Sequence, residues 1–75
     1  MMPLAMATAG KDVRITAIHG GQRIRKRLAD LGLSPGTILH VVQAECQGPV
    51  IVAFRGGGRV GLGRGTAQKI QVEQS

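Results

Sequence analysis

Five short segments of the chain are apolar or alternate between apolar and polar residues, and glycine or proline lies between most of them. These segments are 11–18, 37–44, 50–54, 59–63 and 69–73. In the first of them Val13, Ile15 and Ala17 fall on one face, which is the period of two expected of a half-buried β-strand. Glycine and proline favour the tight turns that join such strands. The pattern therefore predicts a mainly β protein.

Short strands joined by tight turns fit a small, strongly bent barrel better than a flat sheet, because closure hides strand edges that would otherwise aggregate. A chain of 75 residues buries only about 60% of its unfolded surface and supports one core. We therefore predict a single domain over residues 1–75, built as a barrel of about five strands with one inserted short α-helix.

The segment 24–36 follows a helical period. Ile24, Leu28 and Leu31 are spaced i, i+4, i+7, so they form one narrow apolar stripe on a helix. A helix of about ten residues is marginal in isolation, so it forms only if that stripe packs on the barrel. We expect these three side chains to anchor the helix.

The predicted helix stops at a glycine. Gly32 fits the left-handed residue just past a helix end, and Leu33 is expected to fold back onto Leu28. Pro35 prevents the helix from resuming. Gly32 and Leu33 therefore complete the predicted structural anchor.

Four of the ten basic residues crowd into this helix, and we call them the basic ridge: Arg23, Arg25, Lys26 and Arg27. Helical geometry places the three arginines beside the apolar stripe and Lys26 opposite it. The net charge of +6 predicts attraction to nucleic acid, an anionic membrane surface or an acidic protein. We predict that the basic ridge binds this partner.

Catalytic and metal-binding patterns are weak. The four acidic residues form no evident carboxylate pair, and no nucleophile has a plausible base, so we predict no catalytic residue. Iron or zinc needs several converging ligands, whereas His19 and His40 are isolated in the sequence, so we predict no metal site and no cofactor. Cys46, beside Glu45, is expected to be an ordinary reduced cysteine, and a single cysteine excludes an internal disulfide.

The glycines near the end of the chain allow several interpretations. Residues 56–61 match GxGxxG, but a strand-like segment follows where a nucleotide site needs a helix, so a hairpin turn is expected. Gly61, Gly63 and Gly65 share a period of two, which leaves one side of that segment nearly bare. A partner, the amino-terminal segment or a bend in the barrel would each explain this pattern.

Specific nucleic-acid binding is not expected. Single-strand binders stack bases on aromatic rings, and the chain has one aromatic residue, Phe54, in its most apolar strand. Nonspecific binding to phosphates, with its steep dependence on salt, stays open.

The stretch RxRKRLADLGLSPGT, residues 23–37, lies between Gly20-Gly21 and an apolar strand, and a Gly-Pro hairpin and a late LGRGTAQKIQV follow. This order resembles the FeoA family, the small cytosolic partner of the ferrous iron transporter FeoB. The resemblance implies an SH3-like β-barrel with an inserted helix. It also implies a non-enzymatic accessory role in ferrous iron uptake, through contact with the cytosolic part of a FeoB-type membrane GTPase.

One departure from the family concerns the segment after LGR, which is helical in such proteins. Gly65 and Thr66 are poor helix formers, so we expect a looser turn here. A related domain ends some metal-dependent repressors, but this chain has no room for their DNA-binding helix-turn-helix.

The amino-terminal MMPLAMATAG has no basic leading segment, and Pro3 and Gly10 interrupt it well short of the roughly 20 residues that a membrane span needs. We expect a cytoplasmic protein at or near the inner face of the membrane. The alternative is a basic β-barrel module for nucleic acid or another acidic partner, with metal sensing third. Association into oligomers through a barrel edge stays open.

Overall fold

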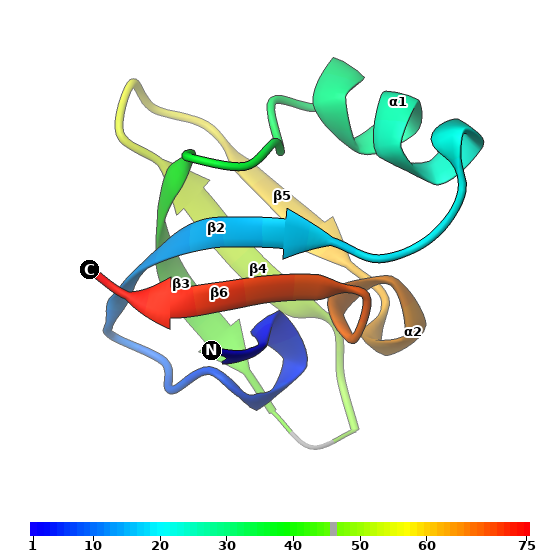
Figure 1. Cartoon of the computed structure of the whole chain (residues 1–75). Coiled ribbons are helices and arrows are strands. Elements are labelled where there is room, and N and C mark those ends of the chain that lie inside the picture. Colours follow the sequence, from blue (N-terminus) through cyan, green and yellow to red (C-terminus); the bar gives the residue numbers. More distant parts are fainter. Residues whose placement is uncertain (46) are drawn as a thin grey trace.

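The computed structural model describes residues 1–45 and 47–75, and it shows an antiparallel sheet curled around a single core (Figure 1). The elements are β1 (Met2–Pro3), the 3-10 helix η1 (Leu4–Met6), β2 (Asp12–Ile18), α1 (Gln22–Asp30), β3 (Ile38–Ala44), β4 (Val50–Phe54), β5 (Arg59–Leu62), α2 (Arg64–Ala67) and β6 (Ile70–Gln74). The strand order is β1-β6-β2-β3-β4-β5. The predicted mainly β fold with an inserted helix is confirmed.

The core contains apolar side chains from β2 to β6 and from the helices. Its buried members are Leu4, Ala5, Ala7, Val13, Ile15, Ile18, Leu28, Leu33, Leu39, Val41, Val50, Val52, Leu62, Ala67, Ile70 and Val72. Most are branched aliphatic residues, which pack well on the pleated surface of a sheet. A domain of this size buries a smaller fraction of its unfolded surface than a larger domain does, so its stability depends on this one cluster.

A β-bulge changes which residues of β2 face the core. The register of β2 against β6 shifts between Ile15 and Ala17, so the alternation changes phase at Thr16. Ile18 is consequently buried and Ala17 is only half-buried. The prediction that Ala17 continues the core face of Val13 and Ile15 is therefore wrong.

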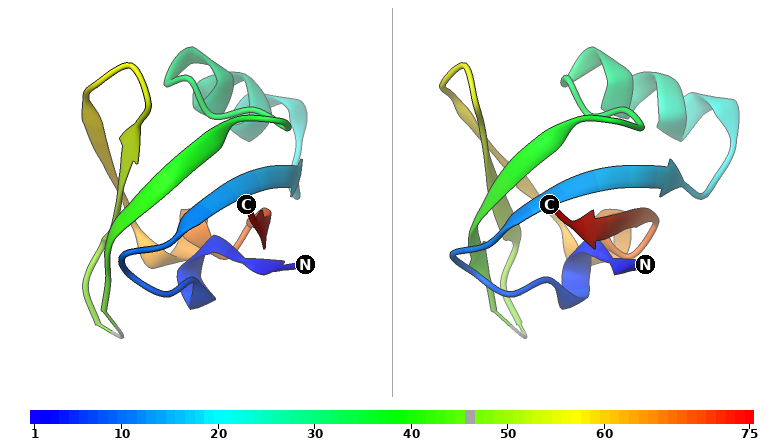
Figure 2. Two further views of the ribbon diagram at one scale, coloured as in Figure 1. Left: turned by 90° about the vertical axis from the view of Figure 1, so that its left-hand side faces the viewer. Right: turned by 60° about the vertical axis from the view of Figure 1, so that its left-hand side comes forward.

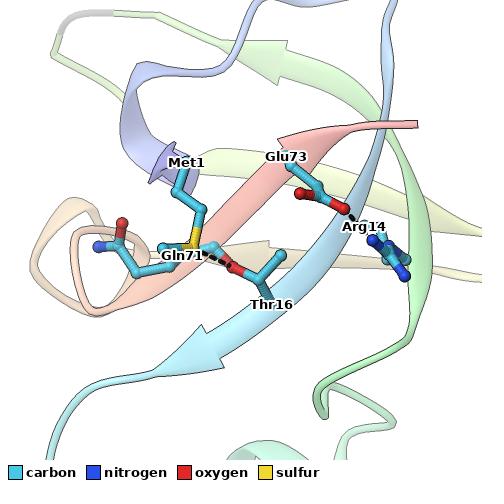
Figure 3. Close-up of polar contacts among 5 residues, drawn as sticks. All are labelled: Met1, Arg14, Thr16, Gln71 and Glu73. Carbon is cyan, nitrogen blue, oxygen red and sulfur yellow. Dashed lines mark hydrogen bonds and ion pairs between the residues drawn. The ribbon is translucent and has the colours of Figure 1, made fainter.

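Side chains on β2 and β6 meet next to this bulge (Figure 3). The Thr16 hydroxyl lies 3.2 Å from the Gln71 carbonyl oxygen and 3.1 Å from the Met1 sulfur. Arg14 forms an ion pair with Glu73 across the same two strands. These contacts join the two ends of the described chain to one face of the sheet.

The barrel is completed by helices and not by a strand pair. Among the described residues β1 and β5 are the two edges of the sheet and do not pair with each other. Instead η1 packs against α2 and β6, with Leu4 and Ala67 both fully buried. The predicted small, strongly bent barrel therefore forms, with packed helices in the gap between its two edge strands.

The segment after LGR is a short helix, α2, and the expectation of a looser turn is wrong. Arg64 at its start donates hydrogen bonds to three backbone carbonyls, those of Ala5, Glu45 and Gly48. At its end Ala67 is fully buried. Tertiary contacts at both ends therefore override the poor helix propensity of Gly65 and Thr66.

Candidate protein-interaction surface

The helix α1 lies across one end of the barrel, joined to β2 and β3 by two short connections (Figure 1). Its carboxyl end has two hydrogen bonds that reverse the chain. The N–H of Leu33 donates to the carbonyl of Leu28 (2.8 Å), and the N–H of Gly32 donates to that of Ala29 (2.9 Å). Gly32 has φ +90°, which is the left-handed conformation that this Schellman-type stop requires.

The anchor of α1 differs from the predicted stripe at one position. Leu28 and Leu33 are buried, with 2% and 0% exposure, and the half-buried Ile24 packs against the core. Leu31 is 46% exposed, so its predicted role as an anchor is wrong. The chain reverses directly after Leu31, and Leu33 returns to the core while Leu31 stays at the rim.

Two glycines position the ends of the helix. Gly20 has φ +126°, and a Cβ placed there would lie 2.6 Å from Cγ2 of Ile24, so this position cannot hold a side chain without a shift. A Cβ on Gly32 would lie 3.3 Å from the Phe54 ring. The one aromatic ring is half-buried, packs against the core and lies next to this glycine, and a single ring does not form a platform on which successive bases stack.

All four side chains of the basic ridge are exposed. Within the described residues none of the four forms an ion pair, whereas Arg14 is paired with Glu73. The first turn of α1 contains no acidic residue. The ridge therefore presents positive charge to solvent without an ion-pair partner among the described residues.

Hollows flank the helix on both sides. Arg25 borders one of about 430 Å³, which lies between α1 and β2 and has an apolar wall that includes Ala17, Ile18 and Leu33. Arg23 and Arg27 border another of about 350 Å³ together with Lys69. Each side of α1 thus combines arginine with recessed surface, which suits an acidic partner that also carries apolar side chains.

Lys69 is the cation that the sequence patterns missed. It lies far from α1 in the sequence, and the fold places it there because the N–H of His19 donates to its carbonyl (2.7 Å). Only the pairing of β2 with β6 creates this proximity, and no local motif carries that information.

The remaining candidate residues do not converge on a site. His40 Nδ1 lies 2.7 Å from Asp12 Oδ1, and both side chains are about half exposed. His19 is exposed at the end of β2. No group of three potential metal ligands occurs within residues 1–45 and 47–75, and the prediction for Cys46 falls outside them.

Neither helix of the described chain has the length and apolar character needed to cross a membrane.

Comparison with known proteins gives consistent matches. The FeoA domain profile matches residues 2–74. A protein of Methanocaldococcus jannaschii named Fe(2+) transport protein A is 37% identical over 75 residues, which is all of this chain and 89% of that protein. The crystal structure of an iron uptake regulatory protein, FeoA, superimposes with a TM-score of 0.90 at 31% identity, covering 99% of this chain and 97% of that one.

The same fold occurs within a larger regulator. A manganese-dependent transcriptional repressor superimposes with a TM-score of 0.86 at 25% identity, covering 97% of this chain and 36% of the repressor. The fold alone therefore does not distinguish a transport role from a regulatory one.

Proposed function

The chain belongs to the FeoA domain family and takes part in ferrous iron transport as a non-enzymatic accessory protein, and from this membership we propose that it docks on the cytosolic part of a FeoB-type transporter through its basic ridge. In this proposal residues 1–75 act as one domain on the cytoplasmic side of the membrane. The transporter supplies the acidic surface that the ridge contacts.

The observation that supports the proposal is the net charge of +3 on α1, from four basic residues against Asp30. Four exposed cations lie on nine residues, and the helix is held by apolar contacts that do not use these side chains. Charges of this kind accelerate association with an acidic partner and orient it, and the effect weakens as salt screens them.

The adjacent membrane contributes to the same contact. Each basic residue near an anionic leaflet adds about 1 kcal/mol of attraction within a Debye length of the surface. The basic ridge is therefore expected to favour a position at the membrane surface, next to the transporter.

The test is the double variant Arg25→Glu, Lys26→Glu, titrated against the transporter in nanodiscs of neutral lipid. We expect a loss of affinity of at least tenfold that shrinks as salt is raised. The matched control, Lys11→Glu with Arg55→Glu, makes the same change of net charge at exposed positions outside α1. This control should bind almost as the parent does.

Equal affinity of the parent and the α1 double variant would exclude the basic ridge as the contact surface. If anionic vesicles without transporter bind the parent as tightly as the transporter does, the partner is the membrane and the proposal fails. Binding to single-stranded DNA at the same affinity and salt would favour the nucleic-acid alternative in the same way.

A further inference from the structure

The outer edge of β5 is open. Among the described residues this strand is the last of the sheet, and β4 is its one strand partner (Figure 2). The N–H of Phe54 donates to the carbonyl of Gly58 (3.0 Å), and this bond sets the alternation of the β4–β5 ladder. Val60 and Leu62 therefore bond to β4, while Arg59 and Gly61 direct their backbone N–H and C=O groups away from it.

Gly61 leaves this edge sterically bare. A Cβ placed there would touch only Ile51, at 4.0 Å, and a Cβ on Gly63 would meet nothing within 4 Å. The amino-terminal segment does not cover either position. Natural edge strands are often protected by proline, a bulge, a covering element, short length or charge. β5 has no proline and no bulge in its register, and its protection comes from its length of four residues and the charge of Arg59.

A groove runs beside the open edge, between β5 and α1, and we call it the β5 groove. It has a volume of about 160 Å³, and its walls include Ile24, Arg27, Leu28, Leu31, Gly61 and Leu62. Leu31, which is 46% exposed, lies at its rim and is the one large exposed hydrophobic side chain outside the first six residues of the described chain. Free backbone groups and a recessed apolar wall therefore adjoin each other.

We propose that β5 receives an extended acidic segment of a partner protein by β-strand addition, with one apolar side chain of that segment in the β5 groove. Main-chain hydrogen bonds to Gly61 and Arg59 supply the affinity, and alternate side chains supply the specificity. This inference concerns a surface that shares only Arg27 with the basic ridge, and it holds whichever transporter component the chain serves.

Charge selects the occupant. Arg27 borders the groove, Arg59 lies on the edge strand, and the chain carries a net charge of +6. A second copy would bring two chains of +6 together, whereas glutamate or aspartate side chains alternating with leucine or valine match both the arginines and the apolar wall.

The test uses the intact protein and a capped peptide of about seven residues that alternates glutamate and leucine. We expect the amide of Gly61 to gain protection from hydrogen exchange on binding. Gly61→Pro removes the outward N–H without a loss from the β4 ladder, and it should weaken binding by about tenfold. Gly61→Ala keeps the N–H and has space for its methyl group, so it should bind as the parent does.

A second measurement leaves the protein unchanged. A peptide that is N-methylated on every second residue cannot donate backbone hydrogen bonds from one of its two edges. Two such peptides carry their methyl groups on opposite sets of residues, and binding should be lost for one peptide and kept for the other. Equal binding of both methylated peptides, or equal affinity of Gly61→Pro and Gly61→Ala, would overturn strand addition.

Two further outcomes overturn the choice of occupant. Protection of the Gly61 amide that rises with protein concentration alone would mean that the edge pairs with a second copy. A lysine–leucine peptide that binds as tightly as the glutamate–leucine peptide would remove the role of charge. The basic-ridge variant Arg25→Glu, Lys26→Glu retains Gly61 and the β5 groove, so a failure of transporter docking and a failure of strand addition are seen separately.

Discussion

The two α-helices of this protein both carry arginine, but they use it differently. On α1 the arginines are exposed, and the helix is held by Leu28, Leu33 and Ile24. On α2 Arg64 points back toward the protein and donates to three carbonyls on two other segments. The nearby backbone, and not the residue type, therefore decides whether a guanidinium stabilises the fold or remains available to a partner.

The largest effect is expected where α1 is anchored. Leu28→Ala should lower the free energy of unfolding by about 2 to 5 kcal/mol, because the side chain is buried and its loss leaves a cavity. Leu31→Ala, the matched control at the carboxyl-terminal cap of the same helix, should cost about 0.5 kcal/mol or less. Urea denaturation measures both, and similar losses would contradict the separation of the anchor from the rim.

Removal of Arg64 tests the other helix. Arg64→Ala should lower stability by about 2 to 3 kcal/mol, since three carbonyls lose a charged donor. Arg27→Ala should change stability little, because its side chain is exposed on α1. If both variants unfold at the same denaturant concentration, the contrast between the two helices is wrong.

The entrance to α1 gives a smaller effect. Gly20→Ala combines an unfavourable positive φ with a close contact to Ile24, and it should cost about 1 to 2 kcal/mol. At the next position Gly21 is the amino-terminal cap, has φ −77° and lacks a side-chain cap bond. Gly21→Ser should therefore be neutral or stabilise by a few tenths of a kcal/mol. Thermal unfolding monitored by circular dichroism distinguishes the two changes.

The smallest effect on stability is expected on the basic ridge. Arg25→Glu with Lys26→Glu should alter the free energy of unfolding by about 0.5 kcal/mol or less, because both side chains are exposed. The same variant is expected to lose affinity for the partner. The basic ridge should therefore affect binding without affecting the stability of the fold. A stability loss comparable to that of Leu28→Ala would show that the ridge serves the fold.

Local signals in the sequence predicted much of this architecture. β4 spans the predicted Val50–Phe54, and the stop at Gly32 has the expected conformation, because alternation and left-handed glycine are local properties. The prediction for Leu31 is wrong because the apolar stripe extends past Asp30, where the helix ends. The half-burial of Ala17 depends on a bulge, which periodicity alone does not reveal.

Other features depended on contacts between distant segments. Leu4 and Ala5 are buried, although their segment shows no regular period. The helix α2 forms against its own propensity, because Arg64 and Ala67 find partners that lie far away in the sequence. The period of two among Gly61, Gly63 and Gly65 indicates a bare side of β5, but only the fold shows that a groove joins this strand to α1.

The position of β6 has a consequence for biosynthesis. This strand lies between β1 and β2, and its residue Gln74 pairs with Val13. Ribosomes synthesise residues in chain order, so β1 and β2 form without the strand that lies between them until β6 has left the ribosome. Assembly of the sheet should therefore be cooperative, and its rate should be limited by closure of the long loop between β2 and β6.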